Sequence, residues 1–236
     1  MVLSLRTSAT AGPAPTGRSL PRRGWQDELV AWERAPGNDG PQLVDLLHDR
    51  WSTRVFDPEH TLDDAQLTTL LEAARWSPSA GNSQPWAFVV GRRGDATHSE
   101  FVRHLSRGNA FWAPRASALI VTLHQTASDE TNEVLYSDYS SYDLGQAAAH
   151  LTVQAMAMGL ATHQFAGFDH DAVAEAFAVP PHWQVTTAIA VGKQLPAETV
   201  EQIEPTIAAR ERLPRTRKPL SQFVFGAKFG EPAAWL

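Results

Sequence analysis

Three separated segments carry residue types that can bind a phosphate group and a polar ring. The first segment, residues 50–56, places the guanidinium groups of Arg50 and Arg54 close to the hydroxyl groups of Ser52 and Thr53. An arginine presents a rigid fork of N–H donors that matches phosphate oxygens, and a nearby hydroxyl adds a neutral donor. The same composition is also typical of a solvated surface loop, so this segment alone predicts only half of an anion site.

The second segment, residues 77–86, reads Ser-Pro-Ser-Ala-Gly-Asn-Ser-Gln-Pro-Trp. It consists mostly of turn-forming residues and amides. Asn82 and Gln84 each offer a donor and an acceptor, which suits the edge of a pyrimidine-like ring that carries both. A ring-binding loop and a plain connection between a helix and a strand explain this composition equally well.

The third segment is the basic run Arg-Thr-Arg-Lys-Pro-Leu at residues 215–220, which follows Arg210 and Arg212. It stands out because the whole chain carries a formal net charge of −6. One interpretation is a flexible basic tail. The other is the second half of a phosphate clamp, folded back against Arg50 and Ser52.

The composition excludes several other kinds of site. The chain contains no cysteine, which rules out a thiolate nucleophile, a disulfide and an iron–sulfur cluster. Its nine histidines form neither an HExxH pair nor a tight cluster with carboxylates, so we predict no metal site. The acidic balance argues against a nucleic-acid-binding domain.

Two further absences limit the location and the cofactor sites. No run of about 18 apolar residues could form a membrane helix, and residues 1–24 lack the apolar region of a secretory signal. We therefore expect a cytoplasmic protein with no membrane partner. The chain also lacks a GxGxxG sequence after a strand and a GxxxxGK[ST] sequence, so no Rossmann site for a nicotinamide nucleotide and no P-loop are predicted.

The elements that must position the three segments begin after residue 40. Prolines and glycines punctuate residues 1–40, which we predict to be a flexible extension with at most a short helix at 25–33. Residues 41–236 form the predicted functional domain. Its pattern predicts the following elements: a short helix with Leu43, Leu46 and Leu47, a helix behind a capping box of Thr61 and Asp64, and buried strands at 86–90, 118–123 and 186–191.

A helix at residues 144–160 is apolar and rich in small residues almost all round. Such a helix is normally buried, either in the core or at a subunit interface. Gln146, His150 and Gln154 form one narrow polar stripe on it, and we interpret His150 as a packing histidine rather than a cofactor contact. Strands mixed with helices predict an α+β or α/β protein.

Taken together, residues 43–225 resemble the nitroreductase family. The resemblance rests on four sequences in the family's order: RWSTRVF, SPSAGNSQPW, YDLGQAAAHLTVQAMAMGLATHQFAGFD and RTRKPL. It implies an α+β fold with a central mixed β-sheet flanked by helices, a long buried central helix, and a C-terminal arm that reaches the partner subunit of a homodimer.

The resemblance also implies FMN bound without a covalent link, in a cleft between the two subunits. Arg50, Ser52 and Arg54 would contact the phosphate and the ribityl or pyrimidine end of FMN, and Trp51 between them would also bind the cofactor. Arg215 and Arg217 would close over the phosphate. The ring would contact Asn109, Phe165 and Gly167 of one subunit, and Pro78, Ser79, Ala80 and Asn82 of the other. No side chain is predicted to be catalytic, because the flavin carries the electrons.

The implied reaction passes hydride from NAD(P)H through the flavin to a small-molecule acceptor such as a nitroaromatic or a quinone, in two half-reactions. Two alternatives stay open. One is a flavin-dependent oxidase or dehydrogenase that tailors a peptide or small metabolite. The other is a non-enzymatic protein that binds an anionic partner through residues 210–218.

Overall fold

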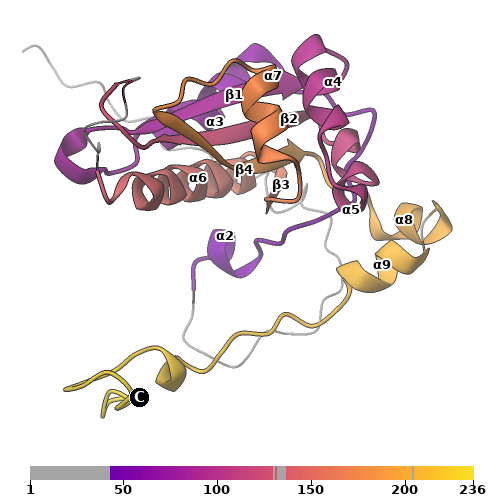
Figure 1. Ribbon diagram of the computed structural model, residues 1–236. Coiled ribbons are helices and arrows are strands. Elements are labelled where there is room, and N and C mark those ends of the chain that lie inside the picture. The colour runs from indigo at the N-terminus through magenta and orange to yellow at the C-terminus, as the bar shows by residue number, and fades with distance from the viewer. Residues whose placement is uncertain (1–42, 130, 132–136, 204) are drawn as a thin grey trace, which may run out of the picture.

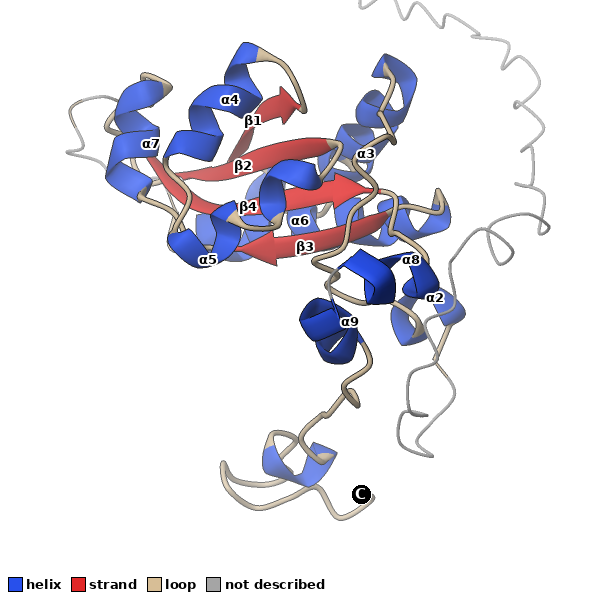
Figure 2. Cartoon of the chain, turned by 90° about the vertical axis from the view of Figure 1, so that its right-hand side faces the viewer, coloured by secondary structure: helices blue, strands red, loops and turns tan. Residues whose placement is uncertain are grey.

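The structure, a computed structural model, describes residues 43–129, 131, 137–203 and 205–236. The predicted extension 1–40 and the helix expected at 25–33 therefore lie outside the described residues. Four strands form one sheet with helices on both faces (Figures 1 and 2), so the fold is α+β as the sequence predicted. No helix in the described ranges is long and apolar enough to cross a membrane.

The sheet is antiparallel throughout the described residues. Its strands are β1 (Trp86–Arg92), β2 (Ala118–Gln125), β3 (Ala161–Phe165) and β4 (Trp183–Gly192), arranged in the order β1-β2-β4-β3. All three neighbouring pairs of strands run antiparallel. The resemblance implied a mixed sheet, and the described strands correct this to an antiparallel one. A parallel pair would need a further strand along β1 or β3, which the described residues do not supply. The sequence also missed β3, because His163 and Gln164 interrupt its apolar pattern.

Alternation along β2 builds a core on each face of the sheet. Leu119, Val121 and Leu123 pack into one cluster, while Ala118 and Ile120 pack into the other, as the two-residue period of a strand requires. The first cluster is covered by α4 (Ala96–Arg103) and α7 (His170–Ala176), and the second by α3 (Asp64–Arg75) and α6 (Ser140–Ala157). Both faces are therefore closed by helices, which leaves the ends and edges of the sheet for binding.

The cap of α3 differs from the predicted one. The Asp63 carboxylate accepts a hydrogen bond from the backbone N–H of Gln66, and the Gln66 side chain accepts one from the backbone N–H of Asp63. The capping box is thus Asp63 with Gln66, not Thr61 with Asp64. The motif requires the two residues to be three apart around the first turn, and both pairs meet that spacing, so the sequence could not choose between them.

Helix α6 is buried on one side only. Leu144, Leu151 and Ala155 pack against α3 and the sheet, whereas Tyr142 and Ala149 are exposed in the single chain. The prediction of an almost wholly buried helix therefore holds for half of its surface. The exposed half keeps the small-residue composition of a packing surface.

The remaining elements lie beside the sheet. They are α2 (Asp45–His48), α5 (Arg107–Ala110), α8 (Ala197–Ile203), α9 (Pro205–Glu211) and the 3-10 turns η1 (Ala80–Asn82), η2 (Ala113–Arg115) and η3 (Leu220–Gln222). A small cluster of Val55, Val200 and Ala208 packs α8 and α9 against the segment that follows α2. Beyond α9 the chain leaves the body as an extended arm that carries η3 (Figure 1).

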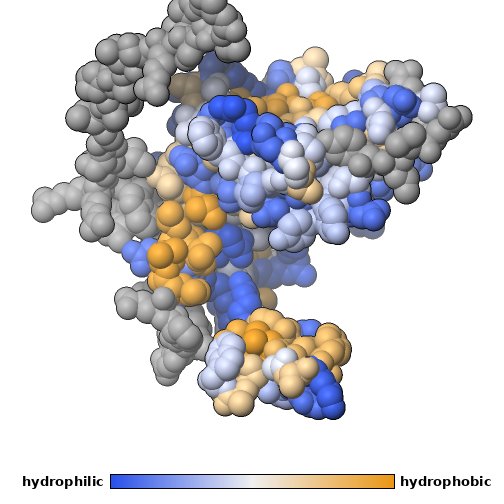
Figure 3. Space-filling model, turned by 90° about the vertical axis from the view of Figure 1, so that its left-hand side faces the viewer, coloured by the Kyte–Doolittle hydropathy of each residue, from blue (hydrophilic) through white to orange (hydrophobic). Residues whose placement is uncertain are grey.

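Two exposed apolar surfaces lie away from the sheet. Leu43, Val44 and Leu47 around α2 are each more than half exposed, and so are Phe223 and Phe229 on the arm. Figure 3 shows apolar surface over the α2 region and again on the arm below it. A single chain therefore leaves exposed Leu43 and Leu47, two of the three apolar residues predicted for the short helix, while Leu46 is half-buried.

Candidate functional site

A cleft of about 490 Å³ joins two of the three predicted segments. On one side lies the segment after α2, and on the other lie the end of α9 and the residues that follow it. Among the described residues, the cleft is lined by Arg50, Trp51, Ser52, Arg54, His163, Arg210, Glu211, Leu213, Pro214, Arg215, Thr216 and Arg217. The structure thus brings together six of the thirteen predicted cofactor-binding residues.

Glu211 holds the two sides of this cleft together. The indole N–H of Trp51 donates to Glu211 Oε2 at 2.8 Å, and the backbone N–H of Arg54 donates to Glu211 Oε1 at 3.0 Å. Glu211 is the last residue of α9 and is only 3% exposed. Since the carboxylate is buried and both of its oxygens are engaged, it fixes the backbone that carries the cleft arginines. The sequence did not single out Glu211, because its partners lie about 160 residues away.

Three guanidinium groups face one another across the cleft. Arg50 Nη1 donates to Ser52 Oγ at 3.0 Å. Burial, and then the positive charges of Arg217 and Arg215, lower the pKa of Arg50 from its ordinary value. A guanidinium stays protonated despite such a shift, so the direction records a cluster of like charges rather than a change of charge state. The cleft is therefore a site where an anion would relieve repulsion.

Arg215 has donor capacity that the described residues do not satisfy. Its Nη1 donates to the backbone carbonyl of His48, which ties the chain after α9 to α2. Its Nε is buried and has no hydrogen-bond partner among the described residues. A buried unpaired donor costs about 1–3 kcal/mol, so an acceptor that enters the cleft would gain from meeting it.

The predicted ring-binding loop does not line this cleft. Pro78, Ala80 and Asn82 are exposed, and Ser79 is half-buried. The buried carboxylate of Asp143 accepts a hydrogen bond from the backbone N–H of Ala80 at 3.0 Å. The backbone of the loop adopts the left-handed conformation at Gly81 and Asn82, with φ of 60° and 55°. Gly and Asn are the residues that tolerate this conformation best. The loop is thus a shaped, exposed surface held from below by α6.

Asn109 and Gly167 lie in direct contact. The Asn109 carboxamide donates through Nδ2 to the Gly167 carbonyl at 3.0 Å and accepts from the indole N–H of Trp112 at 3.1 Å. A Cβ atom at position 167 would lie 2.5 Å from Asn109 Nδ2 and 2.8 Å from Ser106 Oγ, so a side chain there would displace the Asn109 carboxamide or the Ser106 hydroxyl. The sequence grouped Asn109 and Gly167 by resemblance alone, and the structure shows that Asn109 positions the Gly167 backbone.

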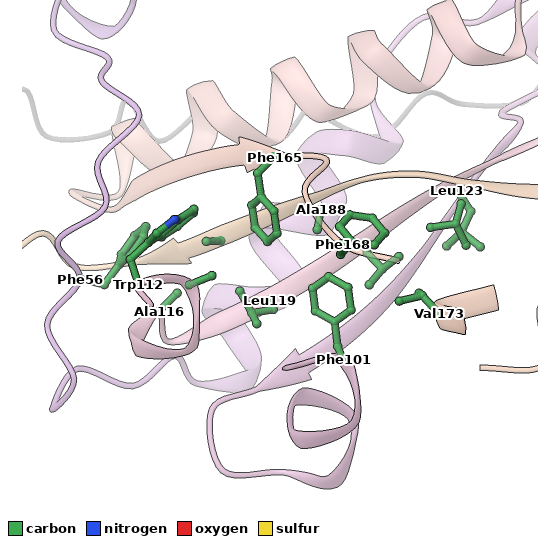
Figure 4. Packing of buried hydrophobic residues seen from close by; sticks show 14 of the residues in the cluster. Phe56, Phe101, Trp112, Ala116, Leu119, Leu123, Phe165, Phe168, Val173 and Ala188 are labelled. Atoms are coloured by element: carbon green, nitrogen blue, oxygen red, sulfur yellow. The ribbon is translucent and has the colours of Figure 1, made fainter. Parts of the chain in front are cut away.

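The side chain of Phe165 lies in the core. Its side chain is only 8% exposed, and its ring centroid lies 5.3 Å from that of Trp112 in an edge-to-face arrangement. Figure 4 shows Phe165 pointing into the core with Phe101 and Phe168. Phe165 is the last residue of β3 and packs into the cluster that α4 and α7 cover. Its side chain is therefore part of the core, and only its backbone could face a ligand.

No group of three or more His, Asp or Glu residues that could hold a metal ion occurs among the described residues. The carboxylate of Asp169 caps α7, because it accepts a hydrogen bond from the backbone N–H of Ala172.

Comparison with known proteins adds a family to this geometry. The model of the nitroreductase family matches residues 47–109 and 95–193. An uncharacterised 15.4 kDa protein of Mycolicibacterium smegmatis is 35% identical over 153 residues, which cover 61% of this chain and 98% of that protein. A Staphylococcus epidermidis protein named "Putative NAD(P)H nitroreductase" is 25% identical over 168 residues, covering 56% of this chain and 76% of that protein.

Solved structures agree with this assignment. The structure of an oxidoreductase containing FMN is 31% identical, with a TM-score of 0.74, and the match covers 85% of this chain and all of that chain. A nitroreductase-like protein of Exiguobacterium sibiricum in complex with FMN is 19% identical, with a TM-score of 0.64 over 78% of this chain and 97% of that one, and so supports the fold. Because the family model matches more than half of this chain, the chain belongs to the nitroreductase family.

Proposed function

We propose that this protein is an FMN-dependent oxidoreductase that takes hydride from NAD(P)H and passes it to a small electron-poor acceptor such as a nitroaromatic or a quinone. The observation that carries the proposal is the cleft in which Arg50, Arg215 and Arg217 face one another, where the described arginines outnumber the one lining carboxylate, Glu211. The solved FMN-containing oxidoreductase that is 31% identical supports the choice of cofactor.

The residues of the cleft suit the phosphate end of FMN. Its dianionic phosphate would offset the repulsion among the three guanidinium groups and would accept from the unsatisfied Nε of Arg215. Ser52 adds a neutral donor beside Arg50. When bound, FMN would supply the two-electron chemistry, so the side chains named here bind and orient and none needs to transfer a proton.

The ring end of the cofactor would require a second copy of the chain. The loop of Pro78, Ser79, Ala80 and Asn82 is shaped and exposed, yet it lies outside the cleft of its own chain. We infer that it completes the site of the partner in a homodimer. The exposed small-residue half of α6 and the apolar residues Phe223 and Phe229 on the arm support this assembly, since large uncovered apolar surfaces mark interfaces.

The turn at Gly167 would face the reacting part of the ring. Asn109 fixes the Gly167 carbonyl, and the lack of a side chain at Gly167 leaves room for the Asn109 carboxamide to do so. Ala166 beside it carries no charge, so we expect this chain to supply no acid or base at the ring. A nicotinamide without its own Rossmann unit would have to visit the same site, which favours two successive half-reactions.

The visible spectrum of the purified protein, recorded anaerobically while NADPH and then NADH are added, tests this function. A flavin double band that either nucleotide bleaches supports the reductase and identifies the donor. A flavin band that neither nucleotide bleaches, but an organic substrate does, supports the alternative of an oxidase or dehydrogenase. A colourless protein that fails to take up added FMN contradicts both.

A further inference from the structure

His163 is a cleft residue that no sequence pattern singled out. It lies on β3 and lines the cleft beside Arg50 and Arg54. Of the titratable side chains that line the cleft, it is the one whose ordinary pKa lies near neutrality. Its charge can therefore respond to what binds there, whereas the charges of the arginines cannot.

The ring of His163 is held in one tautomer. Its Nδ1 lies 2.8 Å from the backbone carbonyl oxygen of Thr53. A carbonyl oxygen can only accept, so Nδ1 carries the proton and the neutral ring keeps its lone pair on Nε2. The ring of Trp112 packs against the imidazole with centroids 4.4 Å apart, which restrains it from turning.

The surroundings of His163 favour its neutral form. Burial lowers its pKa most; the carbonyls of Thr53 and Ser52 raise it, and the charges of Arg54 and Arg50 lower it further. The remaining charged groups that line the cleft are Arg210, Arg215 and Arg217, which add positive charge, and Glu211, whose two oxygens already accept from Trp51 and Arg54. A second proton on this ring is therefore opposed by desolvation and by several guanidinium groups.

We propose that His163 takes up a proton from solvent when a phosphate monoester dianion binds among the arginines, and so adds a positive charge to the site only when the anion is present. The proposal rests on the proposed function, since it names the FMN phosphate as the anion. Two negative charges in the cleft offset part of the positive charge of the arginines that line it, and so lower the cost of the imidazolium. The neutral ring is thus favoured most before the anion offsets the repulsion of its neighbours.

The sign of the pH dependence follows from linkage. Anion binding raises the pKa of His163, so the extra affinity is fully present below the pKa of the anion-free protein and is lost as the pH rises through the pKa of the complex. The FMN phosphate itself titrates near pH 6 and acts in the opposite direction, because arginines favour its dianion and release its proton. Sulfate separates the two effects, since it stays a dianion throughout this range.

Calorimetric titration of the full-length protein with sodium sulfate and with FMN, in two buffers of different ionisation enthalpy, counts the protons exchanged. We expect proton uptake with sulfate near neutral pH in the wild type, loss of that uptake in His163→Gln, and its retention in His104→Gln, which removes the histidine that follows α4 and lies outside the cleft. His163→Gln should also weaken FMN binding about tenfold at low pH, the size of one charge-assisted contact, and less at high pH.

Equal proton numbers in the wild type and in His163→Gln overturn this inference but leave the proposed function standing if FMN binds. If His163→Gln does not fold, the wild type decides alone: no uptake, or release, with sulfate overturns the inference. A protein that binds neither FMN nor sulfate contradicts the proposed function and this inference with it.

Discussion

The carboxamide of Asn109 donates a hydrogen bond to the backbone carbonyl of Gly167 across 3.0 Å. The backbone N–H of Ser106 donates to the same carbonyl, also at 3.0 Å. The turn between β3 and α7 is therefore fixed to the start of α5 by two donors on one acceptor. The lack of a side chain at Gly167 leaves room for the Asn109 and Ser106 side chains that lie against this turn.

Gly167→Ala should destabilise the fold. The added Cβ would lie 2.5 Å from Asn109 Nδ2 and would push that donor away from its acceptor, at a cost of about 1–3 kcal/mol. Urea unfolding measures the effect. Gly108→Ala on α5 is the matched control, because no atom lies within 4 Å of its Cβ position; equal stability of the two variants would contradict the contact.

Glu211→Gln should lower the free energy of unfolding by roughly 1–3 kcal/mol, the cost of a buried group left without its partner. A glutamine replaces one of the two acceptor oxygens with an NH2 donor, so either the Trp51 indole N–H or the Arg54 backbone N–H would face another donor. Glu175→Gln, at an exposed position of α7, serves as the control. A loss of the same size in both variants would show that the Trp51 and Arg54 contacts contribute nothing.

Arg50→Gln should weaken FMN binding about 10- to 100-fold, the equivalent of one charge-assisted hydrogen bond. Riboflavin lacks the phosphate, and its affinity should change much less. Quenching of flavin fluorescence measures both affinities. Arg103→Gln, on the exposed end of α4, should leave them unchanged; an equal loss for riboflavin and FMN would place Arg50 away from the phosphate.

Stability should fall as the pH drops below about 6.5, the ordinary histidine pKa. Burial is the largest cause of the lowered pKa values of His60, His98, His124 and His163. The unfolded chain then binds more protons than the folded one between the lowered values and the ordinary one, so stability is full above that window and is lost as the pH falls through it. Urea unfolding at about pH 7.5 and 5.5 should show this loss, and His98→Gln should reduce it.

Mixed dimers test whether the site is shared. Arg50→Gln damages the cleft, and Ala80→Arg obstructs the exposed loop without touching the backbone bond to Asp143. Each variant alone should bind FMN poorly. A mixed dimer of the two should regain one site of wild-type affinity, because one cleft and one loop remain intact in the same site. No recovery, or normal binding by Ala80→Arg, would mean that the loop serves no partner.

The sequence predicted the parts of the fold that depend on local patterns. The three apolar strands, α3 and α6 were found from periodicity, because each buries a regular face. It missed β3, whose His163 and Gln164 break the alternation, and it chose the wrong capping pair for α3. The mixed sheet came from resemblance and is corrected by the antiparallel pairing of the described strands.

For the site, arginine clusters at 50–54 and 215–217 were enough to predict the two halves of the cleft. What holds them together could not be predicted, since Glu211 acts through contacts with residues about 160 positions away. His163 was hidden for a related reason: a single histidine on a strand gains meaning only from the charges that the fold places around it. Phe165 was assigned to the ligand because resemblance gives a position but not the direction of a side chain.

The cleft arginines and the exposed arm belong to one continuous stretch of backbone, which runs from α9 through Arg215 and Arg217 to η3 without an intervening helix. Whatever anchors the arm also limits how far this stretch can swing. In the proposed homodimer, cofactor retention should therefore depend on protein concentration. Dilution that releases the arm from the partner would weaken the hold of Arg215 and Arg217 on the phosphate, and a bound phosphate would in turn stabilise the dimer.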